Sequence, residues 1–290
     1  MWPSISALVN DHAMAFAPLI YWIVFGAAMV YYCIKHPVYR NRISYICLLA
    51  SIFGIIASIL SILSTTWGAS IEQPAYFVFH GLYITFAFLP FIVAFYTREK
   101  QTKQSNAGKY TAYLGLLWAA ACILGGLATT IMASIIVHQG YFENEGLLIR
   151  LSGGLYFLIL MTWGFIAVIL LLTLIYFKRL TEKHARSSAL TYVLLNLLST
   201  LILTILGFAP LEFSFFTLNA LGYMSIFLVD LPNTIAVFVA FHMGHCWIGD
   251  NQRHLINNDV HNIQSDQAHH DGNVDANNND GSKYELSSGV

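Results

Sequence analysis

Long apolar runs separated by short polar connections occupy most of the chain between residues 16 and 241. Each run has about 20 residues or more, the length that an α-helix needs to cross a bilayer at about 1.5 Å per residue. This pattern predicts an all-α polytopic membrane protein with seven transmembrane helices: 16–34, 43–63, 75–96, 110–137, 154–177, 189–208 and 218–241. A short segment, 1–15, precedes the seven-helix bundle of 16–248, and the polar tail 249–290 follows it. Because the tail lacks apolar periodicity, we expect it to be disordered.

The composition excludes an ordinary soluble domain. Only 10% of the residues are charged and 57% are hydrophobic, with a mean hydropathy of +0.62. Soluble chains carry about 25% charged residues. We therefore expect the lipid bilayer to be the main partner and other membrane subunits to be further partners. No nucleic acid partner is expected.

The basic residues are distributed unevenly between the two sides of the predicted bundle. All 14 Lys and Arg residues except Arg150 lie in the first, third and fifth connections or in the carboxyl tail. Because basic residues concentrate in cytoplasmic loops, the amino terminus is predicted outside and the carboxyl terminus in the cytoplasm. The membrane would be the bacterial inner membrane, or a eukaryotic plasma membrane if the protein is a receptor.

Small residues follow one face of the predicted helix 43–63, at Cys47, Ser51, Gly54 and Ser58. Helices in lipid associate through close packing of such residues. We expect this face to lie against another helix.

Asp230 is the only acidic residue deep inside a predicted span. A carboxyl group at that depth is costly unless it is protonated or paired, so it is a functional candidate. The structural alternative is a protonated Asp230 that bonds Asn196 or Thr200 and holds a kink at Pro232. Asn233 shares a helix face with Asp230, and these polar groups are expected to meet inside the bundle.

His80 is the only histidine well inside a predicted span. It lies about 8 Å below the outer boundary by helix rise, where an imidazole could be an axial haem ligand. His138 is the one other histidine at a suitable depth for a second ligand. The structural alternative is a hydrogen bond from His80 to a neighbouring helix. Asp230 is expected about 10 Å deeper, too far to pair with His80.

Several chemistries are excluded by missing residues. No Lys lies within a predicted span, which excludes a retinal Schiff base. The chain has no HExxH, GxSxG, CxxC or phosphate-binding glycine loop. We therefore predict no catalytic residues and no metal site, and we do not expect catalysis by this chain alone.

The run ISYICLLASIFGIIASILSIL, followed by QPAYFVFHGLYITFAFLPFIVAF, resembles the first two helices of subunit I of the haem-copper oxidases. In that family a helix with small residues precedes one that opens with His-Gly and continues through aromatic residues to a Pro. The resemblance implies that His80 is the axial ligand of a low-spin haem. Where the family has copper-binding histidines, this chain has DLPNTIAVF. The implied protein is a reduced redox or accessory subunit without a copper site.

A second resemblance is to the seven-helix G-protein-coupled receptors, in helix number and orientation. Arg98, in FYTREK, stands where that family has the arginine of its Asp-Arg-Tyr motif. Asp230-Leu-Pro-Asn233 is similar to a scrambled Asn-Pro-x-x-Tyr. This resemblance implies a sensory receptor with Arg98, Asp230 and Asn233 as switch residues. A transporter, an assembly factor or a scaffold is the third interpretation.

Overall fold

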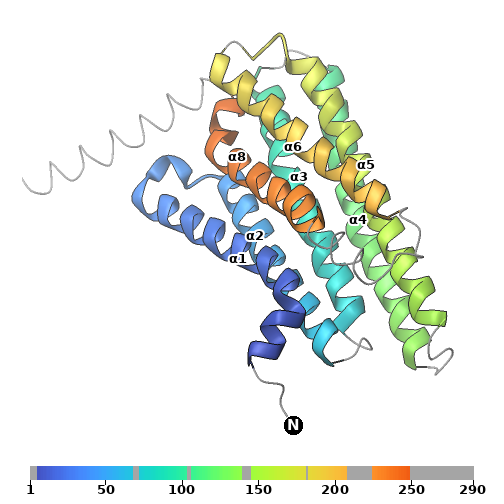
Figure 1. Ribbon diagram of the computed structural model, residues 1–290. Helices are drawn as coiled ribbons and strands as arrows, with labels where there is room; N and C mark the ends of the chain where they lie inside the picture. The colour runs from blue at the N-terminus through green and yellow to red at the C-terminus, as the bar shows by residue number, and fades with distance from the viewer. Residues whose placement is uncertain are drawn as a thin grey trace, which may run out of the picture. The chain divides into compact units, whose positions relative to one another are not determined.

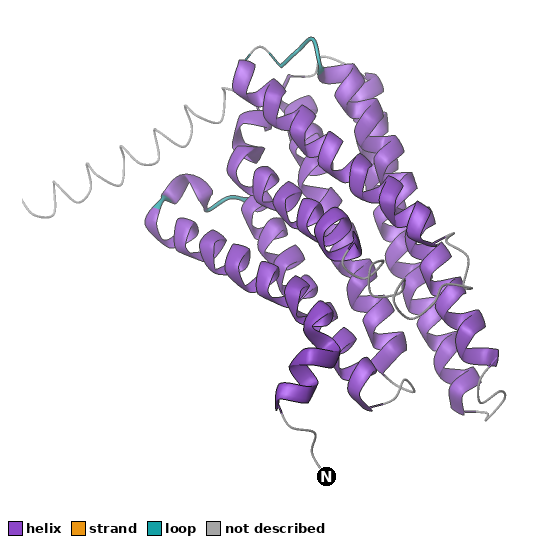
Figure 2. Ribbon diagram, in the orientation of Figure 1, coloured by secondary structure: helices purple, strands orange, loops and turns teal. Residues whose placement is uncertain are grey.

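The computed structural model describes residues 5–67, 72–102, 106–138, 145–180, 182–207 and 224–248. Nearly all of these residues are helical, and no strand occurs within these ranges (Figure 1, Figure 2). The prediction of an all-α protein is confirmed for the described residues.

Seven helices of the described ranges contain an apolar stretch long enough to cross a membrane. They are α1 (Ile5–Lys35), α2 (Arg42–Trp67), α3 (Glu72–Thr102), α4 (Asn106–His138), α5 (Glu145–Tyr176), α6 (Lys183–Gly207) and α8 (Leu231–Ile248). The 3-10 helix η1 (Pro37–Tyr39) lies between α1 and α2, and the π-helix η2 (Ile226–Asp230) leads directly into α8. By length and composition, the predicted number of spans is confirmed.

The last span ends further along the chain than the sequence pattern predicts. The prediction ends it at residue 241, whereas the apolar stretch runs over Ile226–Ile248 within the described residues. The extra turns stay helical because they pack inside the bundle: Gly244, Trp247 and Ile248 are all buried. A Cβ atom on Gly244 would lie 2.6 Å from the Ile43 side chain, so α8 and α2 approach closely at a glycine. The two histidines of HMGHCWI made this segment resemble a connection.

Helices α1 and α2 meet through the stripe of small residues. The Ser51 hydroxyl donates a hydrogen bond to the Trp22 carbonyl at 3.1 Å. A Cβ atom on Gly54 would lie 2.6 Å from the indole of Trp22, so only glycine leaves room for that ring. The expectation that this face packs against another helix is confirmed at these two positions.

Helix α3 lies at the centre of the described helices and contacts α2, α4, α5 and α8 (Figure 1). Its buried Phe91 stacks on Tyr192 of α6, with ring centroids 5.1 Å apart. Trp247 of α8 meets Phe91 edge-on at 5.1 Å and Tyr192 at 5.6 Å. All three side chains are fully buried, so they join α3, α6 and α8 in one aromatic core.

The short η1 helix packs on the end of α8 through Tyr39. The ring of Tyr39 stacks on Phe241 at 5.1 Å, and its hydroxyl oxygen lies 2.9 Å from His242 Nδ1, a hydrogen-bond distance. Burial is the largest cause that raises the pKa of Tyr39 above its usual value, and the neighbouring Tyr32 and Cys246 add to the effect.

Alkaline pH is expected to destabilise the protein partly through Tyr39. The unfolded chain loses this proton near pH 10, whereas the folded protein keeps it to higher pH. The folded state then binds more protons, so the free energy of unfolding falls as pH rises above about 10. Melting temperatures measured between pH 8 and about 11 should fall less steeply in Tyr39→Phe than in wild type. Tyr284→Phe, in the polar tail 249–290, is the matched control and should follow wild type.

Candidate functional site

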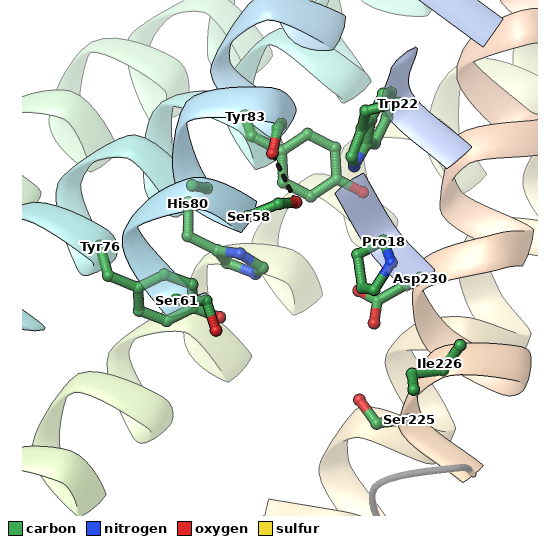
Figure 3. Close-up of a pocket in the computed structure, with 12 residues that line it drawn as sticks. Pro18, Trp22, Ser58, Ser61, Tyr76, His80, Tyr83, Ser225, Ile226 and Asp230 are labelled. Carbon is green, nitrogen blue, oxygen red and sulfur yellow. Dashed lines mark hydrogen bonds between the residues drawn. The ribbon is translucent and has the colours of Figure 1, made fainter. Parts of the chain in front are cut away.

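A cavity of about 280 Å³ lies among α1, α2, α3 and η2 (Figure 3). Polar and aromatic side chains from all four elements line it: Trp22, Ser58, Ser61, Tyr76, His80, Tyr83, Ser225 and Asp230. In Figure 3 the imidazole of His80 and the carboxylate of Asp230 enter this space from opposite sides. The cavity therefore brings the predicted site residues His80 and Asp230 together.

This placement corrects the predicted separation in depth between His80 and Asp230. The prediction counted from residue 218, the outer end of the predicted last span, which put Asp230 deep in the helix. Residue 218 lies outside the described residues. The structure places His80 and Asp230 on the lining of the same two cavities. The two residues are thus at similar levels in the bundle.

A chain of aromatic rings surrounds His80. Its ring centroid lies 5.2 Å from that of Tyr76 and 5.3 Å from that of Tyr83. Tyr83 in turn meets Trp22 edge-on at 4.9 Å. Sequence reasoning missed these three aromatic residues. Tyr76, His80 and Tyr83 follow the i, i+4, i+7 spacing of one helix face, which is the signal that could have found them.

Asp230 and Pro18 both line the cavity (Figure 3). Within the part of the chain that the structure describes, no side chain forms a hydrogen bond or an ion pair with the Asp230 carboxylate. The backbone carbonyl of Asp230 accepts a hydrogen bond from Thr234 Oγ1 at 2.7 Å, which fixes the last turn of η2 to α8. The carboxylate is therefore available to a ligand in the cavity.

The other predicted polar residues bond elsewhere. Asn196 Nδ2 donates to the Tyr192 carbonyl at 2.8 Å, and Thr200 Oγ1 donates to the Asn196 carbonyl at 2.7 Å. The predicted bond from Asp230 to Asn196 or Thr200 is therefore wrong, because both side chains bond their own helix. Near this site α6 and α8 are linked by Ser199, whose hydroxyl donates to Asn233 Oδ1.

A second, smaller cavity of about 20 Å³ adjoins the first and shares His80, Tyr83 and Asp230 with it. Asn196, Ser199, Thr200 and Asn233 also line it. A volume of about 10–15 Å³ with polar partners is enough for one water molecule. The smaller cavity can therefore connect the Asp230 side of the site to the Ser199–Asn233 hydrogen bond.

Arg98 lies at the other end of α3, far along the helix from His80. Its Nη1 donates to the Trp247 carbonyl at 3.2 Å, and its Nη2 donates to the Arg179 carbonyl at 2.8 Å. Sequence reasoning missed the neighbouring Glu99, whose side chain is only 2% exposed and pairs with Arg179 at 3.3 Å. Arg98 therefore ties α3 to the end of α8 and to the connection between α5 and α6.

The volume bounded by the described residues is small for a haem. Pockets for drug-sized ligands have about 300–1,000 Å³, and this volume of about 280 Å³ is close to the lower limit of that range, whereas a haem is larger than most such ligands. The side chain of His138, the predicted second ligand, lies outside the described residues. Among the described residues there is also no group of three or more His, Cys, Asp or Glu placed to hold a metal ion. The role of His80 as a haem ligand stays a prediction of the oxidase resemblance, and the small cavity argues against it.

We expect full-length protein, purified in detergent from cells supplied with haem, to show no Soret absorbance. The reason is the small volume beside His80, between the rings of Tyr76 and Tyr83. A Soret band that is present in wild type and lost in His80→Ala would contradict this expectation and support the oxidase-like interpretation.

Comparison with known protein families, with curated proteins and with solved structures gives no match for this chain.

Proposed function

We propose that this chain is a seven-helix membrane receptor that binds a small ligand in the cavity between His80 and Asp230. In this proposal the amino terminus and the cavity face the outside, and Arg98 faces the cytoplasm. The proposed orientation is supported by the basic connections of the sequence, and the proposed membrane is a plasma membrane. The ligand would act by favouring one arrangement of the helices over another.

One observation carries this proposal. The two helical segments that bring His80 and Asp230 into the cavity, α3 and η2–α8, are joined at their far ends by the bond from Arg98 to the Trp247 carbonyl. A ligand that draws Asp230 and His80 together at one end changes the relative position of two rigid elements. The same two elements hold the Arg98 contacts at the other end.

The hydrogen bonds of Arg98 are of a kind that can be exchanged when the helices move between two arrangements. They include hydrogen bonds to two backbone carbonyls, one of them on Arg179, whose side chain also pairs with Glu99. Hydrogen bonds to a guanidinium can be exchanged for others with little change in packing. The apolar core of Phe91, Tyr192 and Trp247 lies directly beside them, so movement of α8 reaches α6 as well.

Hydrogen–deuterium exchange on the full chain in lipid nanodiscs tests the proposal. A collection of small molecules is first screened for compounds that raise the melting temperature of wild type but not of His80→Leu. A receptor requires that such a compound change exchange both around residues 76–84 and in the peptides that cover 176–180 and 240–248. Protection confined to the cavity would show that the protein binds the compound without any change at residues 176–180 and 240–248. This result would overturn the proposal.

The proposed orientation has its own test. Protease sites or tags placed at the amino terminus and in the tail 249–290 should be accessible from outside and from the cytoplasm, respectively. Access to both ends from one side would overturn the proposed topology.

A further inference from the structure

We propose that the cavity binds a small organic cation, with its ammonium group held by the Asp230 carboxylate and by the rings of Trp22, Tyr76 and Tyr83. This inference rests on the proposed function, because it names the ligand class of the same site. It follows from three properties of the cavity: its charge, its aromatic surface and its size.

The charge of the cavity calls for a positive ligand. Asp230 contributes a carboxylate without a partner among the described side chains, and no Lys or Arg is among the described residues that line the space. An isolated carboxylate away from bulk water is strongly unfavourable unless it is protonated or a positive group or several hydrogen-bond donors accompany it. An anionic ligand would add to this cost, whereas a cation removes it.

The aromatic surface favours a cationic ligand as well. Tyr76, Tyr83 and Trp22 come from two different helices, α3 and α1, and all three line the cavity that Asp230 enters from η2. The face of an aromatic ring attracts a cation within about 6 Å, and cages of such rings recognise quaternary ammonium groups. The edge-on contact of Tyr83 with Trp22 fixes these two rings relative to each other.

The size of the cavity limits the ligand. A volume of about 280 Å³ lies below the range of about 300–1,000 Å³ for drug-sized molecules. His80 and Ser58 stand on the side of the cavity opposite Asp230 in Figure 3. The Ser58 hydroxyl donates to the Gly54 carbonyl at 2.8 Å, so its oxygen is left as an acceptor for a hydroxyl or amine donor of the ligand. The ligand is therefore a small amine with one further polar group.

A bound metal cation is a poorer match than an organic one. Among the described residues no three His, Cys, Asp or Glu side chains converge on one point. Asp230 and His80 could supply only two ligands, and the rest of the described lining is aromatic rings, aliphatic groups and single hydroxyl groups. Hard cations need about six oxygen ligands. Aromatic ring faces can hold an organic cation, which needs no coordinating ligands, but they cannot replace the oxygen ligands of a metal ion.

An isosteric series tests the inference on the full chain in nanodiscs. The probes are choline, its neutral analogue 3,3-dimethylbutan-1-ol and the anion 3,3-dimethylbutanoate; the tert-butyl group of the two analogues has the shape of the trimethylammonium group of choline. Binding is measured by calorimetry and by the shift in melting temperature. We expect choline to bind and both analogues to bind at least about tenfold more weakly, because they lack the charge that Asp230 and the rings require.

Variants then assign the binding to these residues. Asp230→Asn should weaken choline binding by about 30-fold or more, because it removes the opposite charge. Tyr76→Leu should weaken it by about fivefold, and it serves as the deciding variant if Asp230→Asn does not fold. Phe227→Leu is the matched control, since Phe227 lies in η2 but is 54% exposed and does not line the cavity; it should bind like wild type.

The outcomes separate this inference from the proposed function. Equal binding of choline and the neutral alcohol, unchanged binding in Asp230→Asn and Tyr76→Leu, or no binding of choline at millimolar concentration would overturn the ligand class. An exchange response at residues 240–248 to any cavity ligand, charged or neutral, would keep the receptor proposal. Choline binding without that response would keep the ligand class and overturn the receptor proposal.

Discussion

Trp247→Ala is expected to lower the free energy of unfolding by about 3–5 kcal/mol, which is the usual range for removing a buried Trp. The indole is fully buried between Phe91 and Tyr192. Its Nε1 also donates to Ser188 Oγ at 3.0 Å, so the substitution opens a cavity and removes a contact between α8 and α6. The loss is measured from the thermal unfolding of detergent-purified protein followed by circular dichroism.

The matched control for this prediction is Leu174→Ala. Leu174 lies on α5, is 74% exposed and faces away from the other described helices. Its truncation should change the free energy of unfolding by no more than about 0.5 kcal/mol, as at most surface positions. Equal effects of the two substitutions would contradict the central role of Trp247 in the core.

Arg98→Ala is expected to release the end of α8. The substitution removes the two charge-assisted hydrogen bonds to the carbonyls of Trp247 and Arg179. Each bond of this kind contributes about 1.5–3 kcal/mol. Amide exchange in the peptide 240–248 should therefore accelerate by about tenfold or more, as read by mass spectrometry on protein in nanodiscs.

Two further variants show whether the guanidinium itself is responsible. Lys100→Ala removes a neighbouring exposed charge and should leave the exchange of 240–248 unchanged. Arg98→Lys keeps the charge but loses the fork of donors that reaches two carbonyls, so it should restore only part of the protection. Unchanged exchange in Arg98→Ala would show that Arg98 does not hold α8.

Much of the fold could be predicted because uncharged apolar runs of spanning length are typical of membrane helices and rare elsewhere. The position of the last helix could not. Its final turns contain His242, His245 and Cys246, which resemble a connection in a hydropathy pattern, yet Trp247 beside them is fully buried. Whether a segment of mixed polarity ends a helix or extends it depends on the neighbours it packs against, here Ile43 of α2 and Tyr192 of α6.

The sequence analysis singled out His80 and Asp230 separately but did not predict that they share one cavity. His80 and Asp230 each stood out as a polar group in an apolar run, which needs no knowledge of packing. Their meeting depends on how α3 and η2 pack beside α1 and α2, which counting residues along each predicted span cannot show. Tyr76 and Tyr83 were missed because aromatic residues on one face of a membrane helix are ordinary core or lipid contacts. These rings line a cavity only because α1 and η2 lie beside them.

The π-helix η2 affects how this cavity can change over evolution. The Leu231 amide bonds the Ile226 carbonyl five residues back, so this turn holds one residue more than an α-helical turn. The extra residue sets the direction of Asp230 separately from the direction of Thr234, Gly244 and Trp247 further along. Deleting one residue from 226–230 would rotate the acid away while leaving the rest of α8 in register. The ligand selectivity of the cavity can thus change without a change in the packing at the far end of α8.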